Sequence, residues 1–84
     1  MALDAQSTQI KLDDIESKYQ QGLITVTDKL NQMIDSIEYH ITAHLASQSD
    51  YNDRLISSYE RAEKQLRQLN RIERFKNKLD LYVG

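Results

Sequence analysis

The sequence lacks cysteine, proline and tryptophan, and only two of its 84 residues are glycine. Without cysteine the chain can form neither a disulfide framework nor a thiolate metal site. Two glycines cannot spell any of the glycine-rich signatures that hold phosphate groups. Sheet proteins of this length need several turns built from glycine, proline and Asn-Gly pairs, and these turn signals are missing. The absences therefore predict an all-α fold.

Long apolar runs and targeting signals are missing as well. No window approaches the roughly 18 consecutive apolar residues that a membrane span requires. Residues 1–5 have neither the basic start nor the apolar run of a secretory signal. A chain of 84 residues is long enough for one domain. We therefore expect a single cytoplasmic domain without a membrane span, although secretion by a route that needs no signal peptide is compatible with the sequence.

Apolar residues in the first half of the chain recur at steps of three and four, which is helical spacing. They are Leu12, Ile15, Tyr19, Leu23, Val26, Leu30, Met33, Ile37 and Ile41. The spacing predicts a helix over residues 8–46, capped by Ser7 or Thr8, after a frayed segment at 1–7. Residues 22–27 are its weak point, because a glycine there precedes a β-branched run. We expect a kink, and the alternative is a true break with a restart at Thr25 and Asp28.

The second half continues with a polar turn and another stripe of the same spacing. Residues 46–53 are rich in Ser, Asn and Asp, which predicts a turn at 46–50 and a helix over 50–82. The stripe consists of Leu55, Tyr59, Ala62, Leu66, Leu69, Ile72, Phe75, Leu79 and Tyr82. It slips by one position between Leu69 and Ile72, which overwinds a coiled coil locally. The short connection predicts an antiparallel, coiled-coil-like two-helix hairpin, and one continuous rod is the alternative.

Two helices bury only one seam, and a second apolar line is left over. It consists of Ile24, Ile34, Leu45, Ile56, Leu81 and Val83. Because a wide apolar stripe on a bundle helix normally faces further helices, we expect a homo-oligomer, such as a dimeric four-helix bundle, or a helical protein partner. A marginal monomer with scattered surface aliphatics is the alternative. The predicted interface consists of Leu23, Val26, Leu30, Met33, Ile37, Leu55, Tyr59, Leu66, Leu69, Ile72 and Phe75.

Charge is distributed unevenly along the chain. Residues 1–55 hold nine acids and four bases, whereas residues 56–84 hold seven bases and four acids. An acidic helix beside a basic one favours the hairpin register, although each exposed pair contributes only about 0–1 kcal/mol. The basic run at 61–78 predicts possible contacts to an anionic partner at Arg67, Arg71, Arg74 and Lys78. Nucleic acid is disfavoured because the whole chain is acidic, with a net charge of −2, and a solvated or intramolecularly paired face is the main interpretation.

Candidate catalytic and metal-binding groups are few. His40 and His44 lie four residues apart, which supplies half of a metal site, but neither the zinc-protease nor the di-iron motif surrounds them. Asp13 and Asp14 are adjacent, so on a helix they point about 100° apart. Ser57 has no plausible base near it in the sequence. We therefore expect no enzymatic activity, no cofactor and no metal, with both histidines in ordinary structural roles.

Residues 12–22 read Leu-Asp-Asp-Ile-Glu-Ser-Lys-Tyr-Gln-Gln-Gly. This segment resembles the start of the first helix in type III secretion needle subunits, where a similar Leu-Asp-Asp-aliphatic run leads to Lys, an aromatic residue and Gly. The length and the expected hairpin are also similar to that family, and small helical secretion chaperones look alike in general character. The resemblance implies a secreted protein that polymerises into a hollow needle. The family's proline-containing turn and its Asn/Ser-rich second helix are not matched here.

The sequence thus favours a non-enzymatic helical interaction or adaptor protein that acts by self-association or by packing against a partner helix. Its alternatives are a needle-like subunit or chaperone of a secretion system, and a basic-helix regulator that binds nucleic acid.

Overall fold

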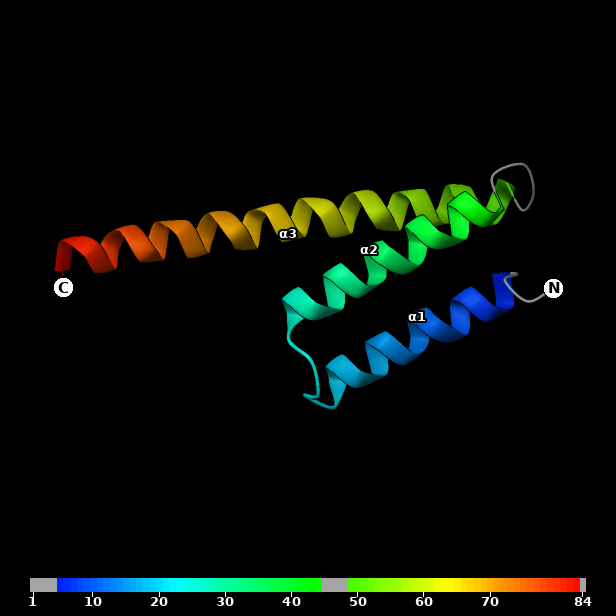
Figure 1. Ribbon diagram of the computed structural model, residues 1–84, viewed down its shortest axis with the longest axis horizontal. Coiled ribbons are helices and arrows are strands. Elements are labelled where there is room, and N and C mark those ends of the chain that lie inside the picture. Colours follow the sequence, from blue (N-terminus) through cyan, green and yellow to red (C-terminus); the bar gives the residue numbers. More distant parts are fainter. Residues whose placement is uncertain (1–4, 45–48, 84) are drawn as a thin grey trace.

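The structure is a computed structural model that describes residues 5–44 and 49–83, and its regular elements are helices. They are α1 (Ala5–Gln20), α2 (Val26–Ala43) and α3 (Ser49–Val83), and α2 lies between the other two in Figure 1. Within these two ranges there is no strand. The predicted all-α class is confirmed, but the two expected helices are three.

The predicted helix over 8–46 is wrong in its continuity, because the chain leaves the helix after Gln20 and re-enters it at Val26. Gly22 has a φ of 77°, in the left-handed region that glycine adopts without steric cost. Its N–H donates to the Tyr19 carbonyl at 3.0 Å, and the next N–H, of Leu23, donates to the Lys18 carbonyl at 2.9 Å. This pair of bonds is a Schellman cap, which satisfies the last carbonyls of α1 and ends the helix.

The start of α2 is held by a reciprocal pair of hydrogen bonds. The Asp28 N–H donates to the Thr25 hydroxyl at 3.0 Å, and the Thr25 N–H donates to the Asp28 carboxylate at 3.2 Å. This capping box satisfies two of the N–H groups that a helix start leaves without a partner. Because both helix ends are capped, the weak point at 22–27 is a true break, as in the alternative, and not a kink.

The start of α1 also differs from the prediction. Residues 5–7 were expected to be frayed but belong to the helix, while residues 1–4 lie outside the described part of the chain. Ser7 and Thr8 therefore lie inside α1 and do not cap it. Thr8 is buried, and its hydroxyl forms a hydrogen bond with Nδ1 of His40 at 2.5 Å. This hydrogen bond thus joins the start of α1 to the end of α2, at the opposite end of the helix pair from the break.

α2 and α3 lie antiparallel. The Asn52 amide donates to the His44 carbonyl at 2.9 Å, and the Tyr59 hydroxyl donates to the Glu38 carboxylate at 3.0 Å. Residue numbers therefore rise along α3 as they fall along α2, which rules out the continuous rod. Part of the predicted turn at 46–50 falls on residues 45–48, outside the described residues, and α3 extends one residue beyond each end of the predicted 50–82.

The core lies where the three helices meet. It consists of Ile15 from α1, Leu30 and Ile37 from α2, and Leu55 and Ala62 from α3. α1 runs antiparallel to α2, with Lys29 Nζ 2.7 Å from the Glu16 carboxylate near the break. That contact holds the pKa of Glu16 below its usual value, because the Lys29 ammonium donates a hydrogen bond to the carboxylate. The core is thus a small three-helix arrangement in which α1 and the first half of α3 pack against α2.

We expect Thr25→Ala to lower the free energy of unfolding by about 1 kcal/mol, since it removes the hydroxyl that caps α2. Urea unfolding followed by circular dichroism measures this change. Thr27→Ala is the matched control, because Thr27 is exposed and is not part of the capping box. Equal stability of the two variants would contradict the assigned role of the cap.

Candidate interaction surface

α3 is much longer than the helix it packs against, with 35 residues compared with 18 in α2. The contacts of His44 with Asn52 and of Glu38 with Tyr59 set their register. If both helices rise equally, Val26 at the start of α2 lies level with about residue 70 of α3. Residues 70–82, here called the α3 extension, project beyond α2 in Figure 1, and all of them are exposed.

Apolar side chains line one face of the α3 extension. This apolar ridge consists of Ile72, Phe75, Leu79 and Tyr82, which are 63%, 63%, 46% and 88% exposed. Their steps of three, four and three place them on one face of the helix. The side of α3 that packs in the core carries Leu55, Tyr59, Ala62, Leu66 and Leu69.

The ridge and the core side of α3 do not form one continuous stripe. At 100° per residue, the centre of the ridge lies about 140° around the helix from the centre of the core side. The change occurs between Leu69 and Ile72, where the sequence stripe slips. The slip therefore marks the point at which the apolar face of α3 turns away from α2.

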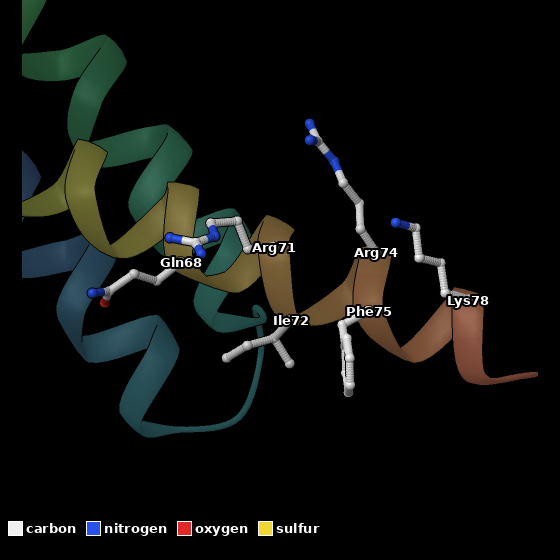
Figure 2. A pocket seen from close by; sticks show the side chains of 6 residues that line it. All are labelled: Gln68, Arg71, Ile72, Arg74, Phe75 and Lys78. Carbon is white, nitrogen blue, oxygen red and sulfur yellow. The ribbon is translucent and has the colours of Figure 1, made fainter.

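A basic strip borders the ridge on one edge. It consists of Arg67, Arg71, Arg74 and Lys78, whose steps of four, three and four keep them in line. On the other edge Lys76 lies nearest to the ridge, and Asp80 and Glu73 lie further round the helix. Figure 2 shows Ile72 and Phe75 pointing to one side of α3 and Arg74 and Lys78 pointing to the other. Among residues 5–44 and 49–83, none of the strip residues forms an ion pair. Within these described ranges, the basic strip is thus a solvated face of α3.

A second surface feature is a groove between α2 and α3, here called the acidic groove. It is lined by Ile41, Thr42, Ile56 and Tyr59, together with Glu38 from α2 and Glu60 from α3. Both carboxylates are exposed. The hydrogen bond from the Tyr59 hydroxyl to Glu38, with burial and the nearby Glu63, raises the pKa of Tyr59 above its usual value. The groove therefore combines an apolar floor with a negative charge from each helix.

The structure places the predicted interface residues in three different environments. Leu30, Ile37 and Leu55 are buried inside the chain. Five others are half-buried, namely Val26, Met33, Tyr59, Leu66 and Leu69. The remaining three are exposed, with Leu23 in the connection after α1 and with Ile72 and Phe75 on the ridge.

Sequence reasoning did not identify the acidic groove, because its residues come from two helices whose relative rotation no periodicity specifies. Leu79 and Tyr82 were also left out of the predicted interface. The signal that could have identified them is the step of three from Leu69 to Ile72, because it separates the ridge from the core side of α3.

The two histidines lie in a packed cluster. His40 is 1% exposed, and its ring centroid lies 4.7 Å from that of His44 and 5.2 Å from that of Tyr51, which it meets edge-on. The Tyr51 hydroxyl donates to the Gln9 side chain of α1 at 3.0 Å. Within the described ranges, no group of three or more His, Cys, Asp or Glu side chains is arranged to hold a metal ion. The cluster joins all three helices at the end of the bundle where α1 and α3 begin and α2 ends.

In comparisons with known proteins, no family model, curated protein or solved structure matches the chain. None of the three helices, over the part of each that the structure describes, is long and apolar enough to cross a membrane.

The core and the ridge should respond differently to truncation. We expect Ile37→Ala to lower the free energy of unfolding by about 2–5 kcal/mol, because it empties part of a closely packed core. Phe75→Ala should change the free energy of unfolding by less than about 0.5 kcal/mol, since its ring contributes to no core. Urea unfolding at the lowest practical protein concentration measures both changes. A comparable loss in Phe75→Ala would show that the ridge is part of the fold.

Proposed function

We propose that the chain is a non-enzymatic interaction protein that acts by packing the apolar ridge of α3 against another protein chain. The observation that carries this proposal is the exposure of Ile72, Phe75, Leu79 and Tyr82 on one face of a helix that no other described element covers. Exposed aliphatics are common when they are scattered singly. Four in register on one face form the anchor pattern of helix-to-helix recognition.

The free energy available from burying the ridge side chains supports this role. Fully burying a side chain such as Ile, Leu or Phe contributes about 1.5–3 kcal/mol, so four such positions can offset the loss of freedom on association. None of the four ridge residues belongs to the buried core of the described residues, because the core side of α3 lies elsewhere on the helix. Its apolar surface is therefore available to a partner.

The three-helix core supports the role in a second way. An isolated helix as short as the α3 extension is marginal in water, because its first turn is costly to form. Here the extension continues a helix that α2 already holds through Leu55 and Ala62. The ridge is thus presented on an existing helix, and a partner does not have to supply the cost of starting one.

A role in a secretion system would be one form of this interaction function. Residues 12–22, which resemble needle subunits, make up the second half of α1 and its glycine cap. A needle-like subunit or a chaperone would use the ridge in the same way, by packing it against another helix.

A photoreactive amino acid in place of Phe75 should cross-link to a protein in living cells, whereas the same group in place of Leu81 should give few adducts. Leu81 is the matched position because it is 85% exposed but lies away from the ridge on the helical wheel. Gel electrophoresis and mass spectrometry identify the adducts. Equal labelling from both positions, or none from position 75, would contradict the proposed function.

Nucleic-acid binding is a second candidate function, and the basic strip is the observation that favours it. Arg67, Arg71, Arg74 and Lys78 follow one line on α3 without an ion-pair partner in the described ranges. Such a line of cations can follow a phosphate backbone, with an affinity that falls steeply as salt increases.

Replacing Arg67, Arg71 and Arg74 together with Glu should abolish binding to short DNA and RNA duplexes at low salt if this second function is correct. Fluorescence anisotropy across a salt series measures the affinity, and Lys11→Glu on α1 is the control, since Lys11 is exposed on a different helix. Unchanged binding in the triple variant would rule this function out.

A further inference from the structure

We propose that the apolar ridge of one copy binds the acidic groove of a second copy. This inference rests on the proposed function and names its partner. Ridge and groove are two different surfaces of the same chain, and their charges are opposite.

The charges match across the contact. The ridge has Arg71 and Lys78 on its basic edge, and on its other edge Lys76 lies nearest to it, with Asp80 and Glu73 further round the helix. The groove has an exposed carboxylate from each of its two helices, Glu38 and Glu60. A helix that lays its ridge into the groove therefore brings cations towards both acidic rims. Such complementarity sets the register and the choice of partner.

The apolar parts match as well. The groove offers Ile41, Ile56 and Tyr59, and Ile56 is 41% exposed although it lies in the half of α3 that α2 covers. The ridge offers Phe75 at its centre, flanked by Ile72 and Leu79 one turn to either side. Both apolar surfaces are incompletely covered in a single chain, and docking would remove both from water.

Antiparallel pairing of two ridges is disfavoured by charge. In that arrangement Ile72 would face Tyr82 and Phe75 would face Leu79, and the same edge of both helices would meet, which brings Arg74 close to Lys78 of the other copy. The antiparallel pair thus gathers like charges at its basic flank, whereas the groove supplies opposite ones.

A chain cannot place its ridge in its own groove. Ile56 and Tyr59 in the groove and Phe75 on the ridge belong to the same uninterrupted helix, α3. The contact must therefore join different copies. A single contact leaves one copy with an unused ridge and the other with an unused groove. Repetition of such a head-to-tail contact gives a closed ring or an open filament.

The decisive experiment mixes two variants, each of which lacks one surface. Phe75→Asp removes the ridge, and Ile56→Asp removes the groove; both positions are partly exposed, and circular dichroism checks that the helices remain. Analytical ultracentrifugation should show a wild-type mass that grows with concentration beyond one chain. Each variant alone should stay at one chain. Their mixture should form a pair of chains and nothing larger, because the pair has no complementary surfaces left.

Leu81→Asp is the matched control, since it adds the same charge to an exposed apolar position of the α3 extension away from the ridge. This variant should assemble as the wild type does. A second comparison exchanges the charges: Arg71→Glu with Lys78→Glu, and Glu38→Lys with Glu60→Lys. Each reversal alone should weaken assembly by about tenfold or more, and the two reversals in one chain should restore most of it.

A wild-type mass of one chain throughout the concentration series would overturn the second-copy partner. So would a mixture of Phe75→Asp and Ile56→Asp that fails to pair. Binding of the monomer to phosphatidylcholine–phosphatidylserine vesicles, lost in Phe75→Asp, would identify an anionic membrane as the occupant and would likewise overturn the inference. Cross-links from position 75 to a different protein would overturn the second copy while leaving the proposed function intact.

Discussion

The chain reversal at residues 21–25 is the constraint on which the rest of the structure depends. Two hydrogen bonds between Thr25 and Asp28 start α2, and the left-handed Gly22 ends α1. Had the helix continued through this point, its N-terminal half would have run on along α3, and in the observed register Tyr19 would lie level with about residue 78. The reversal instead folds α1 back onto α2 and leaves the end of α3 uncovered.

This reversal separates the apolar stripe residues into a buried core and an exposed surface. Ile15 of α1 joins Leu30 and Ile37 of α2 in a core that holds the first half of α3. Among the described residues, Ile72, Phe75, Leu79 and Tyr82 of the α3 extension then have no helix to face. They lie on a different side of α3, so they extend no part of the core and form a separate surface. A small protein thereby combines a packed core with an exposed recognition helix.

Electrostatics reinforces the same division. Acidic residues concentrate before position 55 and basic residues after it. In a closed hairpin these charges would neutralise each other along the seam. With the extension uncovered, the basic strip at Arg67 and Arg74 is left without ion pairs among the described residues, while Glu38 and Glu60 border a groove elsewhere. Opposite charges that are separated on one chain favour contact between chains, which is the basis for the proposed head-to-tail association.

The sequence by itself determined the helical class, the two stripes, the weak point at 22–27 and the slip after Leu69, because all of these depend on local propensity and spacing. Only the tertiary structure decided that the weak point is a reversal, since glycine accepts both the right-handed conformation of a kinked helix and the left-handed one of a helix cap. Ile37 and Phe75 occupy equivalent positions in their stripes, yet one is fully buried and the other is 63% exposed. Periodicity says which side chains share a face, but whether another helix covers that face depends on helix lengths and register in three dimensions.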